Sequence, residues 1–154
     1  MRSVVATVRA RKAVREVWTT ASDPKLWPSF VEAFVGYGAK FRGEVAAGPH
    51  DPAGMGTEVT VARKSGPPIM RCRVAWWDPP RGFTITAQTG GWMTAYHGTF
   101  TLRLSELDEE LTSMELAMKF VFMNRFVELA SLLLPVSVLY RSRLAKTLRL
   151  IAGQ

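Results

Sequence analysis

MNRFVELASLLLPVSVLYRSRLAKTLRLIAGQ, residues Met123 to Gln154, is the stretch that decides the fold of this chain. Its apolar residues recur at alternating steps of three and four, which predicts one long helix that bends at Pro135. The half before Pro135 is apolar on nearly every side, so a sheet, a partner chain, a bilayer or a ligand must cover it. The predicted buried stripe consists of Phe126, Ala130, Leu133, Ser137, Tyr140, Leu144, Leu148 and Ile151.

The length and composition predict a soluble globular protein with a single domain, residues 1–154. A chain of 154 residues can bury about 70% of its unfolded surface, which is enough for a core. Hydrophobic residues make up 47% and charged residues 21%, which excludes disordered and membrane-embedded classes. The longest apolar run, Leu129 to Leu139, is too short to cross a bilayer and contains a proline.

The cysteine and histidine counts argue against a disulfide and against a metal site. Cys72 is the single cysteine, and with only two histidines the chain cannot assemble the usual four-ligand zinc site. The glycines match neither a dinucleotide fingerprint nor a P-loop, so we expect no cofactor. The N-terminal sequence lacks the apolar region and cleavage site of a signal peptide. These features together predict a reducing, cytoplasmic location.

The formal net charge of +7 raises two candidate partners, nucleic acid and an anionic membrane surface. The basic residues are scattered, and the chain has neither an aromatic RNA-binding signature nor a zinc-finger framework. We therefore expect a solvated basic surface and no nucleic-acid partner.

The middle of the chain predicts an antiparallel sheet. Two helical segments, Lys12 to Ala21 and Lys25 to Ala33, separate the first predicted strand from the second. Short turn sequences such as DPPRG join the later strands, which favours a meander over parallel crossovers. The predicted strands are Ser3 to Arg9, Phe34 to Glu44, Thr57 to Lys64, Ile69 to Trp77, Phe83 to Gln88, Trp92 to Leu104 and Leu111 to Phe122.

Alternation within these strands predicts one apolar face, across which the terminal helix would lie. The residues that share this face are Met70, Cys72, Val74 and Trp76; Trp92, Thr94, Tyr96, Gly98, Phe100, Leu102 and Leu104; and Met114, Leu116, Met118 and Phe120.

Four stretches carry a resemblance to a known superfamily. VREVWTTASDPKLWPSF, Val14 to Phe30, is similar to its opening motif. Further similar segments are GMGTEVTV at Gly54 to Val61, WWDPPRGFTI at Trp76 to Ile85 and GTFTLRLSELDEELTSMEL at Gly98 to Leu116. The chain resembles the START-like, SRPBCC or birch-pollen-allergen-like superfamily, including its polyketide cyclase/dehydratase-type branch. The resemblance implies an α+β helix-grip fold, in which about seven curved strands wrap around a long C-terminal helix.

This resemblance also implies a cavity between the sheet and the terminal helix for a hydrophobic small molecule of lipid, polyketide or isoprenoid type. Aromatic and methionine side chains on the apolar face suit such a ligand. The same side chains could instead fill a closed core. The candidate lining residues are Trp76, Trp92, Thr94, Tyr96, Phe100, Met114, Met118, Phe120, Phe126, Leu129 and Leu133.

Few polar residues are candidates for catalysis. Tyr96 and Asn124 could donate hydrogen bonds to a carbonyl or enolate, as a polyketide cyclase or dehydratase would require. The alternative is that Tyr96 bonds to a backbone carbonyl. Cys72 lies among apolar residues and is expected to be an inert core thiol.

The second half of the terminal segment is basic, through Arg141, Arg143, Lys146 and Arg149. Cations near a helix C-terminus complement the helix dipole. The functional alternative is peripheral contact with an anionic membrane. The surplus leucines of the first half leave a further alternative, a homodimer that acts as an interaction module without a ligand.

Overall fold

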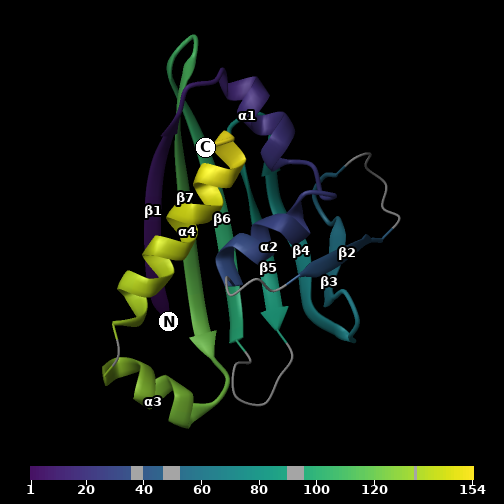
Figure 1. Cartoon of the computed structure of the whole chain (residues 1–154), viewed down its shortest axis with the longest axis vertical. Helices are drawn as coiled ribbons and strands as arrows, with labels where there is room; N and C mark the ends of the chain where they lie inside the picture. The colour runs from purple at the N-terminus through teal and green to yellow at the C-terminus, as the bar shows by residue number, and fades with distance from the viewer. Residues whose placement is uncertain (36–39, 47–52, 90–95, 134) are drawn as a thin grey trace.

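The computed structural model describes residues 1–35, 40–46, 53–89, 96–133 and 135–154, with the side chain of Tyr96 excepted. Its centre is a curved antiparallel sheet of seven strands in the order β1-β7-β6-β5-β4-β3-β2. The helices α1, α2 and α4 lie on one side of this sheet, with α4 running diagonally across β1 and β7 (Figure 1). The predicted helix-grip architecture is confirmed.

The elements follow one another in the predicted order. They are β1 (Arg2–Ala10), α1 (Val14–Ala21), α2 (Trp27–Val35), β2 (Phe41–Val45), β3 (Glu58–Arg63), β4 (Pro68–Asp78), β5 (Gly82–Thr89), β6 (Tyr96–Asp108), β7 (Leu111–Phe122), α3 (Arg125–Leu133) and α4 (Val136–Ala152).

The second strand begins later than the sequence predicts. Phe34 and Val35 belong to α2, and β2 starts only at Phe41. The reason is helical spacing: Phe34 follows Trp27 by seven residues, so both side chains lie on the same buried face of α2. The intervening residues 36–39 lie outside the described residues, as do residues 92–95 of the predicted sixth strand.

The terminal segment forms two helices, so the prediction of one bent helix is wrong. Pro135 has no N–H to continue the helical hydrogen bonds, and it lies at the N-cap of α4. Beyond the end of β7, α3 turns away from the axis of α4 (Figure 1). The predicted stripe therefore holds only in α4, where Leu144, Leu148 and Ile151 are buried.

The first half of the stripe faces solvent. Phe126 is 84% and Leu133 is 89% exposed, and Ala130 is also exposed, because α3 has no strand beneath these side chains. In α3 only Ser131 is buried. Ser137 in the first turn of α4 is exposed as well.

Truncation of one leucine in α3 and one in α4 tests whether α4 is buried and α3 is exposed. Leu148→Ala should lower the free energy of unfolding by about 2–5 kcal/mol, because a fully buried side chain leaves a cavity. Leu133→Ala should change it by less than about 0.5 kcal/mol, because that side chain is exposed. Urea denaturation measures both values, and equal losses would contradict the observed packing.

Candidate functional site

A cavity of about 90 Å³ lies between the sheet, α2 and the C-terminal half of α4. Its walls come from the two helices α2 and α4 and from the strands β3 to β7. The lining residues are Trp27, Phe30, Val31 and Phe34 of α2; Val61, Met70, Cys72, Phe83, Ile85, Phe100, Leu102 and Leu116 of the sheet; and Leu144, Thr147 and Ile151 of α4.

Aromatic contacts hold α2 against the sheet at the edge of this cavity. The Trp27 ring stacks on Phe83 with the centroids 5.7 Å apart, and its Nε1 donates a hydrogen bond of 3.0 Å to the Ala21 carbonyl. At the other end of α2, Phe34 meets the edge of Phe100 at 5.6 Å. These contacts hold α2 and the sheet together as two walls of the cavity, and the indole N–H has a hydrogen-bond acceptor.

The hydroxyl group of the lining is hydrogen-bonded, and its thiol group stays protonated. The Thr147 hydroxyl donates a hydrogen bond of 3.1 Å to the Arg143 carbonyl, one turn earlier in α4. Burial raises the pKa of the Cys72 thiol to about 12, which keeps it protonated at neutral pH. Among the described residues, the cavity therefore presents apolar surface and no group suited to acid–base or nucleophilic chemistry.

Some predicted lining residues of the sheet lie in the cavity wall, and others lie in the filled core. Phe100 lies in the cavity wall. Met114, Met118 and Phe120 are fully buried outside that wall, where they fill the core under α4. Phe120 packs edge-on against Phe122 and Tyr140, with centroids 5.3 and 5.1 Å away.

Trp76 is 40% exposed and does not line the cavity, so its prediction is wrong. The pairing of β4 with β5 shifts between Val74 and Trp76, and this irregularity reverses the alternation beyond it. Trp77 takes the inward position instead, with its ring 5.0 Å from Trp18 and 5.5 Å from Phe83.

The predicted lining residues of the terminal segment are also misplaced. Phe126, Leu129 and Leu133 are exposed on α3, away from the cavity. Trp92 and Thr94 lie outside the described residues. For Tyr96 the structure describes the backbone, which pairs with Phe122 at the start of β6, and not the side chain.

Asn124 has a structural position at the start of α3. Its Oδ1 accepts hydrogen bonds from the backbone N–H of Phe126 at 2.9 Å and of Val127 at 3.4 Å. This is the geometry of an N-terminal cap. Asn124 thus caps α3 through its Oδ1 and is not among the residues that line the cavity.

Sequence reasoning missed the contribution of α2 to the site. Trp27, Phe30, Val31 and Phe34 recur at steps of three, one and three, so they form one apolar helix face. This spacing indicates the apolar face of α2, although the sequence predicts a strand that begins at Phe34.

Two kinds of site are absent from the described part of the chain. No group of three or more histidine, cysteine, aspartate or glutamate side chains there could hold a metal ion. Within the same residues, no helix is long and apolar enough to span a membrane.

Comparison with known proteins establishes the fold. No protein-family model and no curated protein matches the chain. A point mutant of norcoclaurine synthase from Thalictrum flavum, solved with a transition state analogue, is similar with a TM-score of 0.63 and 15% identity, over 99% of this chain and 94% of that chain. The same enzyme with dopamine and hydroxybenzaldehyde gives 0.62 and 14%, over 99% and 88%. A conserved protein from Geobacillus kaustophilus gives 0.63 and 13%, over 99% and 96%.

The cavity thiol offers a direct chemical test. At about pH 8, Cys72 in the folded protein should not react with a disulfide reagent that modifies thiolates, because burial raises its pKa to about 12. After unfolding in guanidinium, one thiol per chain should react rapidly. Rapid labelling of the native protein, followed by absorbance of the released thiolate, would contradict the burial of Cys72 in the apolar lining.

Proposed function

We propose that residues 1–154 form a single helix-grip domain that binds a hydrophobic small molecule in the cavity between the sheet, α2 and α4. The observation that carries the proposal is the cavity itself, which lies between the gripping elements and has an apolar lining. A cavity of this kind stays dry, and the binding of an apolar molecule in it lowers the free energy of the system.

The cavity size favours a compact ligand. At about 90 Å³ it is smaller than the roughly 150 Å³ cavity that accommodates benzene in a well-studied engineered protein. It suits a ring or a short branched chain, such as one end of an isoprenoid or polyketide. The similar norcoclaurine synthase was solved with dopamine and hydroxybenzaldehyde, which are also small aromatic molecules.

A larger lipid would require movement of α2. This helix forms one wall through Trp27, Phe30, Val31 and Phe34, and displacing it would open the cavity without breaking a strand pairing. The single free cysteine, Cys72, remains our reason for proposing a reducing, cytoplasmic location.

The described lining favours binding over catalysis. A cyclase or dehydratase needs a polar group near the reacting atom, and the Thr147 hydroxyl and Cys72 thiol do not meet that need. Tyr96 is the remaining candidate for the enzymatic alternative. Loss of turnover of a poly-β-ketone in Tyr96→Phe, with an unchanged melting temperature, would support that alternative.

Filling the cavity tests the binding proposal. Val31→Phe places a ring in the cavity wall and should weaken the binding of toluene or indole at least about tenfold, because the ligand loses its space. Saturation-transfer NMR measures this binding. Displacement of a fluorescent fatty acid reports on longer ligands, and native mass spectrometry detects an apolar molecule that co-purifies.

The matched control is Val45→Phe, the same change at an exposed position of β2. It should leave binding unchanged, and thermal unfolding verifies that both variants fold. Absence of binding by every probe and of any co-purified molecule would overturn the proposal. Equal affinities in the two variants would place binding elsewhere.

A further inference from the structure

The strongest unassigned feature is the outer face of α3, formed by Phe126, Leu129, Leu132 and Leu133. All four side chains are exposed and follow one another at helical spacing; Phe126, Leu129 and Leu133 lie on the side opposite Ser131, and Leu132 lies nearer to β1. Exposed apolar residues continue into the first turn of α4 with Val138 and Leu139. A contiguous apolar surface of this kind in a folded protein marks an interaction site.

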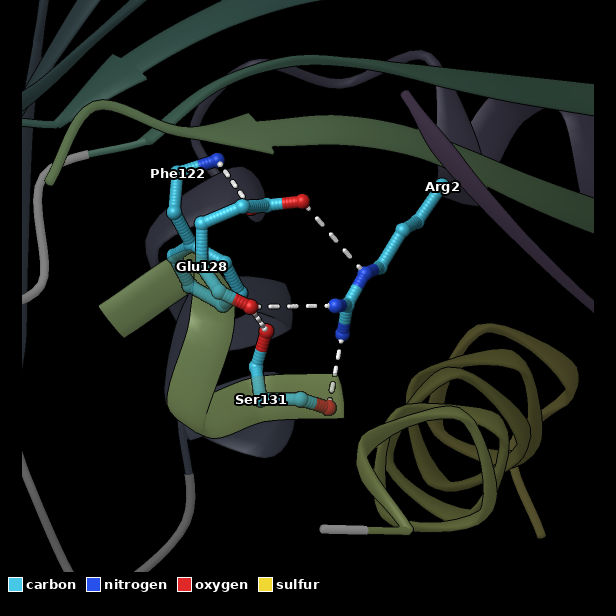
Figure 2. Close-up of polar contacts among 4 residues, drawn as sticks. All are labelled: Arg2, Phe122, Glu128 and Ser131. Atoms are coloured by element: carbon cyan, nitrogen blue, oxygen red, sulfur yellow. Dashed lines mark hydrogen bonds and ion pairs between the residues drawn. The ribbon is translucent and has the colours of Figure 1, made fainter. Parts of the chain in front are cut away.

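Specific polar contacts fix the orientation of α3. The guanidinium of Arg2 on β1 donates hydrogen bonds to the carbonyls of Ser131 at 2.9 Å and Glu128 at 3.2 Å, and its Nε lies 3.6 Å from the Glu128 carboxylate (Figure 2). The other carboxylate oxygen accepts a hydrogen bond of 3.3 Å from the Phe122 N–H. The polar side of α3 is thereby attached to the sheet, and its apolar side is held outward.

The charged residues of segment 116–154, which contains α3 and α4, are nearly all basic. The basic residues of segment 116–154 are Lys119, Arg125, Arg141, Arg143, Lys146 and Arg149. Glu128 is the single acidic side chain in that segment, and it faces Arg2. The partner of the outer face should therefore combine an apolar interior with a negative surface.

These charges disfavour a second copy of the chain as the partner. A twofold contact through α3 would bring two basic surfaces together. The helix has nine residues, so it is only about 14 Å long and provides little of the roughly 800 Å² per partner that a stable dimer requires.

We propose that the outer face of α3 docks on an anionic lipid bilayer. Phe126 and the three leucines enter the boundary between headgroups and acyl chains, and Arg125 contacts the headgroups. Arg141, whose Nε donates a hydrogen bond of 3.2 Å to the Val5 carbonyl, adds a positive charge beside them. Lys146 and Arg149 on the exposed side of α4 add attraction over a longer distance. This inference does not depend on the cavity, because none of its residues lines the cavity.

Vesicle sedimentation tests the apolar contribution. The wild-type protein should bind vesicles that contain about 30% phosphatidylserine and should bind pure phosphatidylcholine at least tenfold more weakly. Phe126→Ser combined with Leu133→Ser should lower the binding to anionic vesicles by about tenfold or more. The control Leu107→Ser, at an exposed position near the opposite end of the β6–β7 pair, should not.

Neutralisation tests the charge contribution. Arg125→Gln combined with Arg141→Gln should weaken the binding about 25-fold, on the basis of about fivefold per basic residue at the surface. Arg63→Gln combined with Lys64→Gln removes the same charge at the end of β3, on the side of the sheet far from β1 and β7, and should have a smaller effect.

A label at position 133 gives an independent readout. Because Cys72 is buried, a polarity-sensitive dye should attach selectively to Leu133→Cys, and its emission should shift to the blue on anionic vesicles. Leu107→Cys should show no shift. Absent vesicle binding, binding that survives the double serine change, or a dimer that the same change dissociates would each overturn the proposal.

Discussion

The missing N–H of Pro135 is the constraint on which the arrangement of the C-terminal segment depends. A helix can begin at this residue and cannot continue through it, so α3 and α4 are free to take different directions. Only α4 crosses the sheet, where Leu144 and Leu148 become fully buried. The helix that completes the core is thus separated from the helix on which Phe126, Leu129, Leu132 and Leu133 are exposed.

This separation also locates the two surfaces that suit partners. The cavity lies where the C-terminal half of α4 meets α2, among aromatic rings that leave a small apolar space. The apolar face of α3 lies beyond the end of β7 and is held outward by Arg2. The cavity suits a small molecule, and the apolar face of α3 suits an extended surface.

The sequence predicted the fold well because strand alternation, turn residues and helical spacing all agreed with one architecture. It predicted the site poorly, for reasons that specific residues illustrate. Alternation placed Trp76 inward, but the irregularity after Val74 brings Trp77 there instead. Periodicity identified the apolar side of Phe126 and Leu133, but it cannot distinguish a buried face from an exposed one. The spacing of the α2 residues indicated an apolar helix face, but it could not show that this face forms a wall of the cavity.

The strand order has a consequence for how the chain acquires its structure. In the described part of the chain β1 is an edge strand that pairs with β7, and Arg2 pairs with Phe120 more than a hundred residues later. During synthesis the first strand therefore waits for this partner until residues 111–122 have left the ribosome. Such long-range pairing slows folding and leaves strand edges open to aggregation in the interval. The final helix, which packs against β1, completes the domain only after that delay.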